Sequence, residues 1–275
     1  MKKIISALLS VLLIVSIVAC GNNTVSTETK AAEKKKFVVG FDAEYPPYGY
    51  LNDNGEYTGF DLELAEEVCK RLGYELVKQP IDWDSKDMEL NSGSIDCIWN
   101  GFTVTGREKN YTWSIPYVDN SIVVAVNNDS NIKELADLAG KTVIVQVGSS
   151  GLSALEDESV PENVDLKNSF KDLLQCQDYN SAFMNLESGL VDAIVVDIGV
   201  AKFQLNNRKD QFRLLDSDIS KEQYAIGFKL GNTELKNIVE KTVIEMYKDG
   251  TFMKIANKYE SFSLPNMICI GEYIK

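Results

Sequence analysis

One segment of the 275-residue chain, residues 95–107, changes abruptly from apolar to polar and limits the possible folds more than any other feature. Its apolar part, residues 95–99, follows turn-forming residues and is typical of a buried strand in a parallel sheet. Its polar part offers an amide, a glycine, two hydroxyls and the guanidinium of Arg107. Ligands of open α/β sheets bind beyond the carboxyl ends of the strands, and a guanidinium can hold two oxygens at once. The segment therefore predicts a carboxylate site; the alternative on these residues alone is an ordinary surface loop.

Composition excludes several function classes. The chain is 44% hydrophobic and 25% charged, as expected of a globular protein large enough for two lobes. Its net charge of -13 argues against nucleic-acid binding, because no basic stripe can neutralise phosphates. Histidine is absent, which excludes histidine bases and histidine metal ligands. The five cysteines show no CxxC spacing, so zinc has no support, and their pairing stays open.

The N-terminal segment has the pattern of an export signal. Lys2 and Lys3 precede an apolar run over residues 4–19, which predicts a signal peptide. The end of this run, with Cys20 followed by Gly21, resembles the bacterial lipobox, whose cysteine is lipidated and becomes the mature first residue. The resemblance implies a lipid (palmitate) anchor on the extracytoplasmic face of the cell membrane. Residues 20–36 are polar and predict a flexible tether.

The rest of the chain alternates between strand and helix patterns. Apolar residues at spacings of three and four over 62–72 predict a helix that ends at Gly73. A strand over 141–146 leads into a glycine-rich turn, and a strand over 191–197 places Asp197 at its carboxyl end. Further strands are predicted over 37–41, 74–78, 121–126 and 222–228, and helices over 233–248 and 250–259.

Four motifs in register resemble the extracytoplasmic amino-acid-binding proteins of ABC importers. They are Tyr-Pro-Pro-Tyr at 45–48, Gly-Phe-Asp-Leu at 59–62, Gly-Ser-Ile-Asp at 93–96 and Gly-Phe-Thr-Val-Thr-Gly-Arg at 101–107. The resemblance covers about residues 37–262. It implies an α/β, two-lobed periplasmic-binding-protein fold of type II, in which each lobe is a mixed sheet flanked by helices. Two hinge strands join the lobes, which would be residues 37–124 with 224–263, and 125–223; residues 264–275 would form a C-terminal extension.

The resemblance also implies a ligand site. Arg107 would bind the ligand's carboxylate together with Thr103 and the amides of Ser149 and Ser150. Asp197 would bind its ammonium. The remaining implied contacts are the Gly101 carbonyl, the aromatic walls Tyr45 and Trp83, and Asp42, Phe60, Trp99, Asn100 and Gln146. One departure is that Arg107 follows Thr105 by two residues, whereas the family usually has three; Gly106 can absorb the altered turn.

The expected function is binding without catalysis. The resemblance implies a monomer with no cofactor or metal that delivers a free L-amino acid to permease subunits. The segment Trp99-Asn100-Gly101 favours a polar or cystine-like ligand. One alternative is an enzyme of the cyclohexadienyl or arogenate dehydratase type, with a carboxylate such as Glu44 as an acid. A second alternative is a ligand sensor domain, although no signalling module follows in the sequence.

Overall fold

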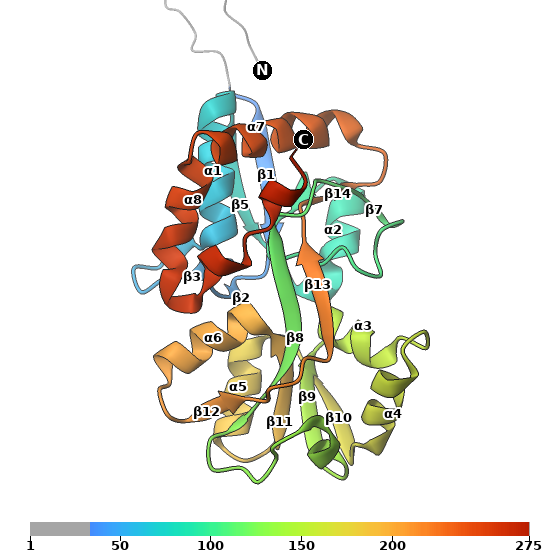
Figure 1. Ribbon diagram of the computed structural model, residues 1–275. Helices are drawn as coiled ribbons and strands as arrows, with labels where there is room; N and C mark the ends of the chain where they lie inside the picture. The colour runs from blue at the N-terminus through green and yellow to red at the C-terminus, as the bar shows by residue number, and fades with distance from the viewer. Residues whose placement is uncertain (1–33, 275) are drawn as a thin grey trace, which may run out of the picture. The chain divides into compact units, whose positions relative to one another are not determined.

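The computed structural model describes residues 34–274, which form one compact unit (Figure 1). The predicted signal peptide, the lipidation site Cys20 and most of the predicted tether lie outside the described residues. Among residues 34–274, no helix has the length and apolar character needed to cross a membrane.

Two mixed sheets, each flanked by helices, make up the architecture and confirm the α/β class. In the first sheet the strand order is β5-β1-β6-β14-β7, and β1 is parallel to both of its neighbours. Packed with this sheet are α1 (Phe60–Leu72), α2 (Lys86–Ser92) and α7 (Thr233–Lys248), and α8 (Thr251–Ala256) packs on α1 and α7. The strands are β1 (Lys36–Phe41), β5 (Glu75–Pro80), β6 (Cys97–Ile98), β7 (Tyr111–Trp113) and β14 (Gly227–Lys229).

The second sheet has the order β10-β9-β11-β8-β12, with β13 also paired to β8. Its strands β10, β9 and β11 are parallel, while β8 is antiparallel to β11, β12 and β13. Its strands are β8 (Val118–Asn127), β9 (Thr142–Gln146), β10 (Asp172–Cys176), β11 (Ala193–Asp197), β12 (Phe212–Leu214) and β13 (Ser220–Tyr224). Its helices are α3 (Ser150–Glu156), α4 (Pro161–Ser169), α5 (Tyr179–Glu187) and α6 (Ile198–Asn207).

Three short strands and five 3-10 turns complete the fold. The strands β2 (Glu44–Tyr45), β3 (Gly49–Leu51) and β4 (Tyr57–Thr58) form a small antiparallel sheet. The turns are η1 (Trp83–Ser85), η2 (Leu135–Leu138), η3 (Asn257–Phe262), η4 (Leu264–Met267) and η5 (Ile270–Glu272).

Buried apolar faces explain most of these elements. Helix α1 buries Leu62, Ala65 and Cys69, the face that the spacing predicts. It ends at Gly73, whose φ of 69° is the left-handed conformation that glycine adopts without steric cost. The cysteines at 69, 97, 176 and 269 are free thiols. Three of the four are buried, as small apolar side chains commonly are.

The strands β8 and β13 run side by side and extend from the second sheet toward the first (Figure 1). Their register pairs Val118 with Tyr224 and Ile122 with Ser220. The prediction of one strand over 222–228 is wrong, because the chain breaks there into β13 and β14. The N–H of Ile226 donates to the Ser114 hydroxyl at 2.9 Å, and the chain then joins the first sheet. Alternation of apolar residues shows which face is buried, but not that the pairing partner changes.

Candidate functional site

The predicted polar residues follow the carboxyl ends of three parallel strands. Thr103 and Arg107 come after β6 of the first sheet, and Ser149 and Ser150 after β9 of the second. Asp197 is the last residue of β11. Carboxyl ends of parallel strands are where open α/β sheets bind ligands. Residues from both sheets are therefore positioned to contribute to one site.

Asp197 is a buried carboxylate bound by neutral donors. One of its oxygens accepts hydrogen bonds from the Asn120 amide at 2.8 Å and the Tyr224 hydroxyl at 2.6 Å. The other accepts a long one from the Tyr179 hydroxyl at 3.5 Å. Burial raises the pKa of Asp197, because the ionised form loses its hydration. Within residues 34–274 no lysine or arginine nitrogen lies within 4.0 Å of it. An ammonium group of a ligand could supply the missing positive charge.

Glu222 is a second buried carboxylate at this site, and the sequence interpretation missed it. Its Oε1 accepts hydrogen bonds from the hydroxyls of Thr103 at 2.7 Å and Ser150 at 3.0 Å, and from the Asn120 amide at 2.7 Å. Burial, and then the nearby charge of Asp197, raise the pKa of Glu222 to about 7. Thr103, which was predicted to bind a ligand carboxylate, thus donates its hydroxyl to a carboxylate of the protein, as does Ser150, of which only the amide was predicted as a contact.

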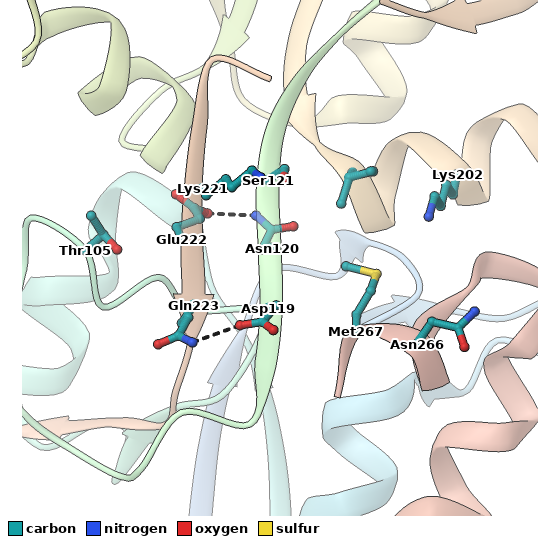
Figure 2. Close-up of a pocket in the computed structure, with 11 residues that line it drawn as sticks. Thr105, Asp119, Asn120, Ser121, Lys202, Lys221, Glu222, Gln223, Asn266 and Met267 are labelled. Carbon is teal, nitrogen blue, oxygen red and sulfur yellow. Dashed lines mark hydrogen bonds between the residues drawn. The ribbon is translucent and has the colours of Figure 1, made fainter. Parts of the chain in front are cut away.

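A period-two pattern could have identified this residue. In a strand, residues two apart lie on one face. Glu222 therefore shares a face with Tyr224, and both are buried. Figure 2 shows Glu222 on β13 beside Asn120 on β8, joined by their hydrogen bond.

A cavity of about 630 Å³ opens along the same two strands, between α6 and η4 (Figure 2). Asn120 and Glu222 contribute to its lining, together with the exposed Asp119 and the half-buried Gln223. None of the thirteen predicted ligand-binding residues lines it. The cavity therefore does not coincide with the predicted ligand site.

Arg107 lies between the two sheets. Its guanidinium donates to the carbonyl of Thr103 at 3.3 Å and to that of Gly148 at 3.2 Å, and it lies 5.3 Å from the centre of the Phe102 ring. The hydroxyl of Ser149 caps α3 by accepting the Leu152 N–H at 3.1 Å. The cation is thus adjacent to the turn that begins α3.

A second polar network joins Asp42 to the other sheet. The Asp42 carboxylate accepts from the Gln146 amide at 2.7 Å and from the Glu44 N–H at 2.8 Å. The backbone N–H of Asp42 donates to the Asn100 side-chain oxygen at 3.0 Å. Burial raises the pKa of Asp42 to about 6. Asp42 and Trp83 also line a cavity of about 410 Å³.

The aromatic residues divide into two groups. Tyr45 and Trp83 stack with their rings 6.4 Å apart and 7° from parallel, and the Tyr45 hydroxyl lies 3.2 Å from that of Tyr224. Trp99 is fully buried in the hydrophobic core. Phe60 is also in the core, where it packs against other aromatic rings, and the structure does not bring it to Asp197 or Arg107.

Gly101 has a conformation that the site requires. Its φ is +53°, and its N–H donates to a buried oxygen of Asp61 at 2.6 Å. An added Cβ would lie 2.8 Å from Tyr45 Cε1 and 3.0 Å from Tyr224 Cε2. Both rings would have to move, and with them the hydroxyl that binds Asp197.

We expect Gly101→Ala to destabilise the fold by more than the roughly 1–2 kcal/mol of a left-handed alanine, because two rings must also shift. Gly106→Ala is the matched control, since Gly106 has a φ of +78° with no atom within 4 Å of an added Cβ. Urea unfolding of both variants measures the difference. Equal losses in the free energy of unfolding would mean that the two tyrosine rings move without an energetic cost.

Comparison with known proteins places this architecture in a family. Residues 37–262 match the model of the bacterial extracellular solute-binding proteins, family 3. The L-cystine-binding protein TcyJ of Escherichia coli (strain K12) is 30% identical over 233 residues, which are 84% of each chain. The arginine-binding extracellular protein ArtP of Bacillus subtilis (strain 168) is 30% identical over 265 residues, covering 94% of this chain and 98% of ArtP.

Solved structures agree with the sequence relatives. An ABC uptake transporter substrate-binding protein from Streptococcus pneumoniae with bound histidine has a TM-score of 0.77 and 33% identity, covering 82% of this chain and 92% of its own. These matches confirm the predicted two-lobed periplasmic-binding-protein fold of type II. The relatives are binding proteins, so the dehydratase alternative is set aside. Its sequence match and its fold together assign this chain to the bacterial extracellular solute-binding proteins of family 3.

Proposed function

We propose that this protein captures a free L-amino acid, polar or cystine-like, between two lobes and delivers it to an ABC importer. The lobes are residues 37–124 with 224–263, and residues 125–223, with 264–275 as a C-terminal extension. The protein acts as a monomer without a cofactor. One observation carries the proposal. Asp197 is a buried carboxylate without a neighbouring cation, and it lies, like Arg107, where the two sheets meet.

The ligand contacts follow from the two charges of an amino acid. Both charges must be paired once they leave water, because unpaired buried charges are costly. Arg107 binds the carboxylate with the amides of Ser149 and Ser150, and Asp197 binds the ammonium. Thr103 joins the carboxylate contacts when its hydroxyl turns away from Glu222, to which it donates in the structure. The other proposed contacts are Asp42, Tyr45, Trp83, Asn100, the Gly101 carbonyl and Gln146. Phe60 and Trp99 lie in the hydrophobic core and are left out of the proposed contacts.

The first experiment identifies the ligand. The soluble chain without residues 1–20 is unfolded and refolded to remove bound molecules, then titrated calorimetrically with the twenty L-amino acids and L-cystine. We expect binding of one polar amino acid or of L-cystine, because similar chains include cystine-binding and arginine-binding proteins. Mass spectrometry of what the native protein carries is an independent check. Binding of none of these compounds overturns the proposed function.

Ligand binding should also close the two lobes. The proposed contacts come from both lobes, so neither lobe alone pairs both charges. A ligand shifts such an equilibrium only through its preference for the closed form, and a shift from mostly open to mostly closed requires roughly 5 kcal/mol. Small-angle scattering should show a smaller radius of gyration at saturating ligand. An unchanged radius, with binding confirmed in the same sample, favours a preformed pocket.

Lipidation of Cys20 should anchor the protein to the extracytoplasmic face of the membrane. A diacylated cysteine anchors stably, whereas a single acyl chain binds only weakly. In a bacterial host with a lipoprotein pathway, Cys20→Ala should move the protein to the soluble fraction or leave it as precursor. Membrane fractionation and intact mass measure this, with Ser26→Ala as the anchored control. A wild-type protein without a lipid mass contradicts the prediction.

A further inference from the structure

Lys86 is a buried cation that neither the sequence interpretation nor the proposed ligand contacts include. It is the first residue of α2, and only 5% of its surface is exposed. Lysine is almost never this buried unless it is paired. Its ammonium donates to the carbonyl of Trp83 at 3.1 Å and to that of Gly148 at 3.2 Å, and it lies 5.1 Å from the centre of the Trp83 ring.

Lys86 shares one carbonyl with Arg107. The guanidinium of Arg107 donates to the same Gly148 oxygen, also at 3.2 Å. Within residues 34–274 no carboxylate oxygen lies within 4.0 Å of either cation. Burial, and then the charge of Arg107, lower the pKa of Lys86 to about 8. Two positive charges thus converge without a carboxylate in contact with either, although Asp84 and Asp87 act on Lys86 from further away.

The turn between β9 and α3 comes close to both cations. Gly148 has a φ of +65°, and an added Cβ would lie 3.2 Å from the Lys86 ammonium. Glycine therefore lets the turn before α3 approach the two cations closely. The next residues are Ser149 and Ser150, whose amides are the proposed contacts for the ligand's carboxylate.

We propose that Lys86 is a second cation of the carboxylate subsite and makes the site specific for amino acids with a free, ionised α-carboxylate. The inference rests on the proposed function above. A carboxylate that enters beside Arg107 and the 149–150 amides reaches both cations. It supplies the direct carboxylate contact that they lack, and its two oxygens can contact one cation each. A carboxamide or peptide-linked carboxyl group carries no charge and gains little from Lys86.

The test is a double-mutant cycle that combines a change in the protein with a change in the ligand. The variants are Lys86→Met, which removes the charge and the donor, and Lys86→Gln, which keeps a donor. Each is titrated with whichever of the twenty L-amino acids and L-cystine binds the wild type most tightly, and with the α-carboxamide of that compound. Thermal unfolding of each variant confirms that it folds.

We expect Lys86→Met to raise the Kd for the free amino acid at least tenfold and that for the carboxamide less than twofold. Lys86→Gln should change the two Kd values as Lys86→Met does, because glutamine keeps a donor but not the charge. Equal changes for the two compounds, or none, overturn the proposal and leave Lys86 as a contact between the lobes. Wild-type protein that binds no compound of the panel overturns the proposed function instead, and this proposal with it.

Discussion

Arg107→Ala and Asp197→Ala are each expected to weaken binding of the same L-amino acid at least tenfold. Each substitution leaves one ligand charge buried without its partner, which typically costs about 2–5 kcal/mol. The fold should survive, because Arg107 is only partly buried in a loop and Asp197 is the last residue of its strand. Isothermal titration with the amino acid identified for the wild type measures the loss.

Control substitutions separate the effect of a lost ligand contact on affinity from the effect of a changed net charge. Lys109→Ala removes an exposed cation from the loop that carries Arg107, and Asp216→Ala removes an exposed carboxylate near β12. Neither should change the affinity by more than a small factor, since exposed charges are screened by water and salt. If Arg107→Ala binds as tightly as the wild type, the carboxylate has another partner. The short spacing between Thr105 and Arg107 would then explain why Arg107 does not bind the carboxylate.

Asp61→Asn is expected to make the protein less sensitive to pH between about 4 and 7. Asp61 is fully buried, and one of its oxygens accepts the Gly101 N–H at 2.6 Å. Burial raises the pKa of Asp61 to about 7 from an ordinary value of 3.8. In this window the folded protein therefore keeps a proton that the unfolded chain has released.

The sign of the effect follows from proton linkage. When the folded state binds more protons than the unfolded state, the free energy of unfolding falls as the pH rises. A pKa difference of one is worth about 1.4 kcal/mol, so Asp61 should remove roughly 2–4 kcal/mol of stability between pH 4 and pH 7. Asparagine has the same shape, has no charge to bury and keeps an oxygen for the Gly101 N–H.

Urea unfolding at pH 5 and pH 8 measures this difference. The wild type should lose more stability than Asp61→Asn as the pH rises. Asp42 and Glu222, whose pKa values are also raised, contribute with the same sign in both proteins and cancel in the comparison. Asp53→Asn, at an exposed position, should behave like the wild type. An Asp61→Asn protein that loses as much stability as the wild type rules out a buried charge at this position.

Local patterns in the sequence were sufficient for several elements, while the two-lobed fold came from the family resemblance. The predicted helix over 250–259 is too long, because α8 ends at Ala256. The long helix α7 has the predicted bounds, Thr233–Lys248, and β11 ends at Asp197 as the apolar run predicts. Helix α1 ends at Gly73, where a left-handed backbone is needed. These features depend on side-chain period, caps and backbone freedom, all of which are set by residues a few positions apart.

Only the tertiary structure decided which charged groups meet at the site. Glu222 contacts Thr103 across 119 positions of sequence, and Lys86 reaches the Gly148 carbonyl across 62. The break between β13 and β14 likewise depends on which strand each segment pairs with. Side-chain period identifies the buried face of an element but carries no information on what packs against that face. The segment 95–107 already pointed to Arg107, and the family resemblance added the role of Asp197. The contacts of Glu222 and Lys86 were decided only by the tertiary structure.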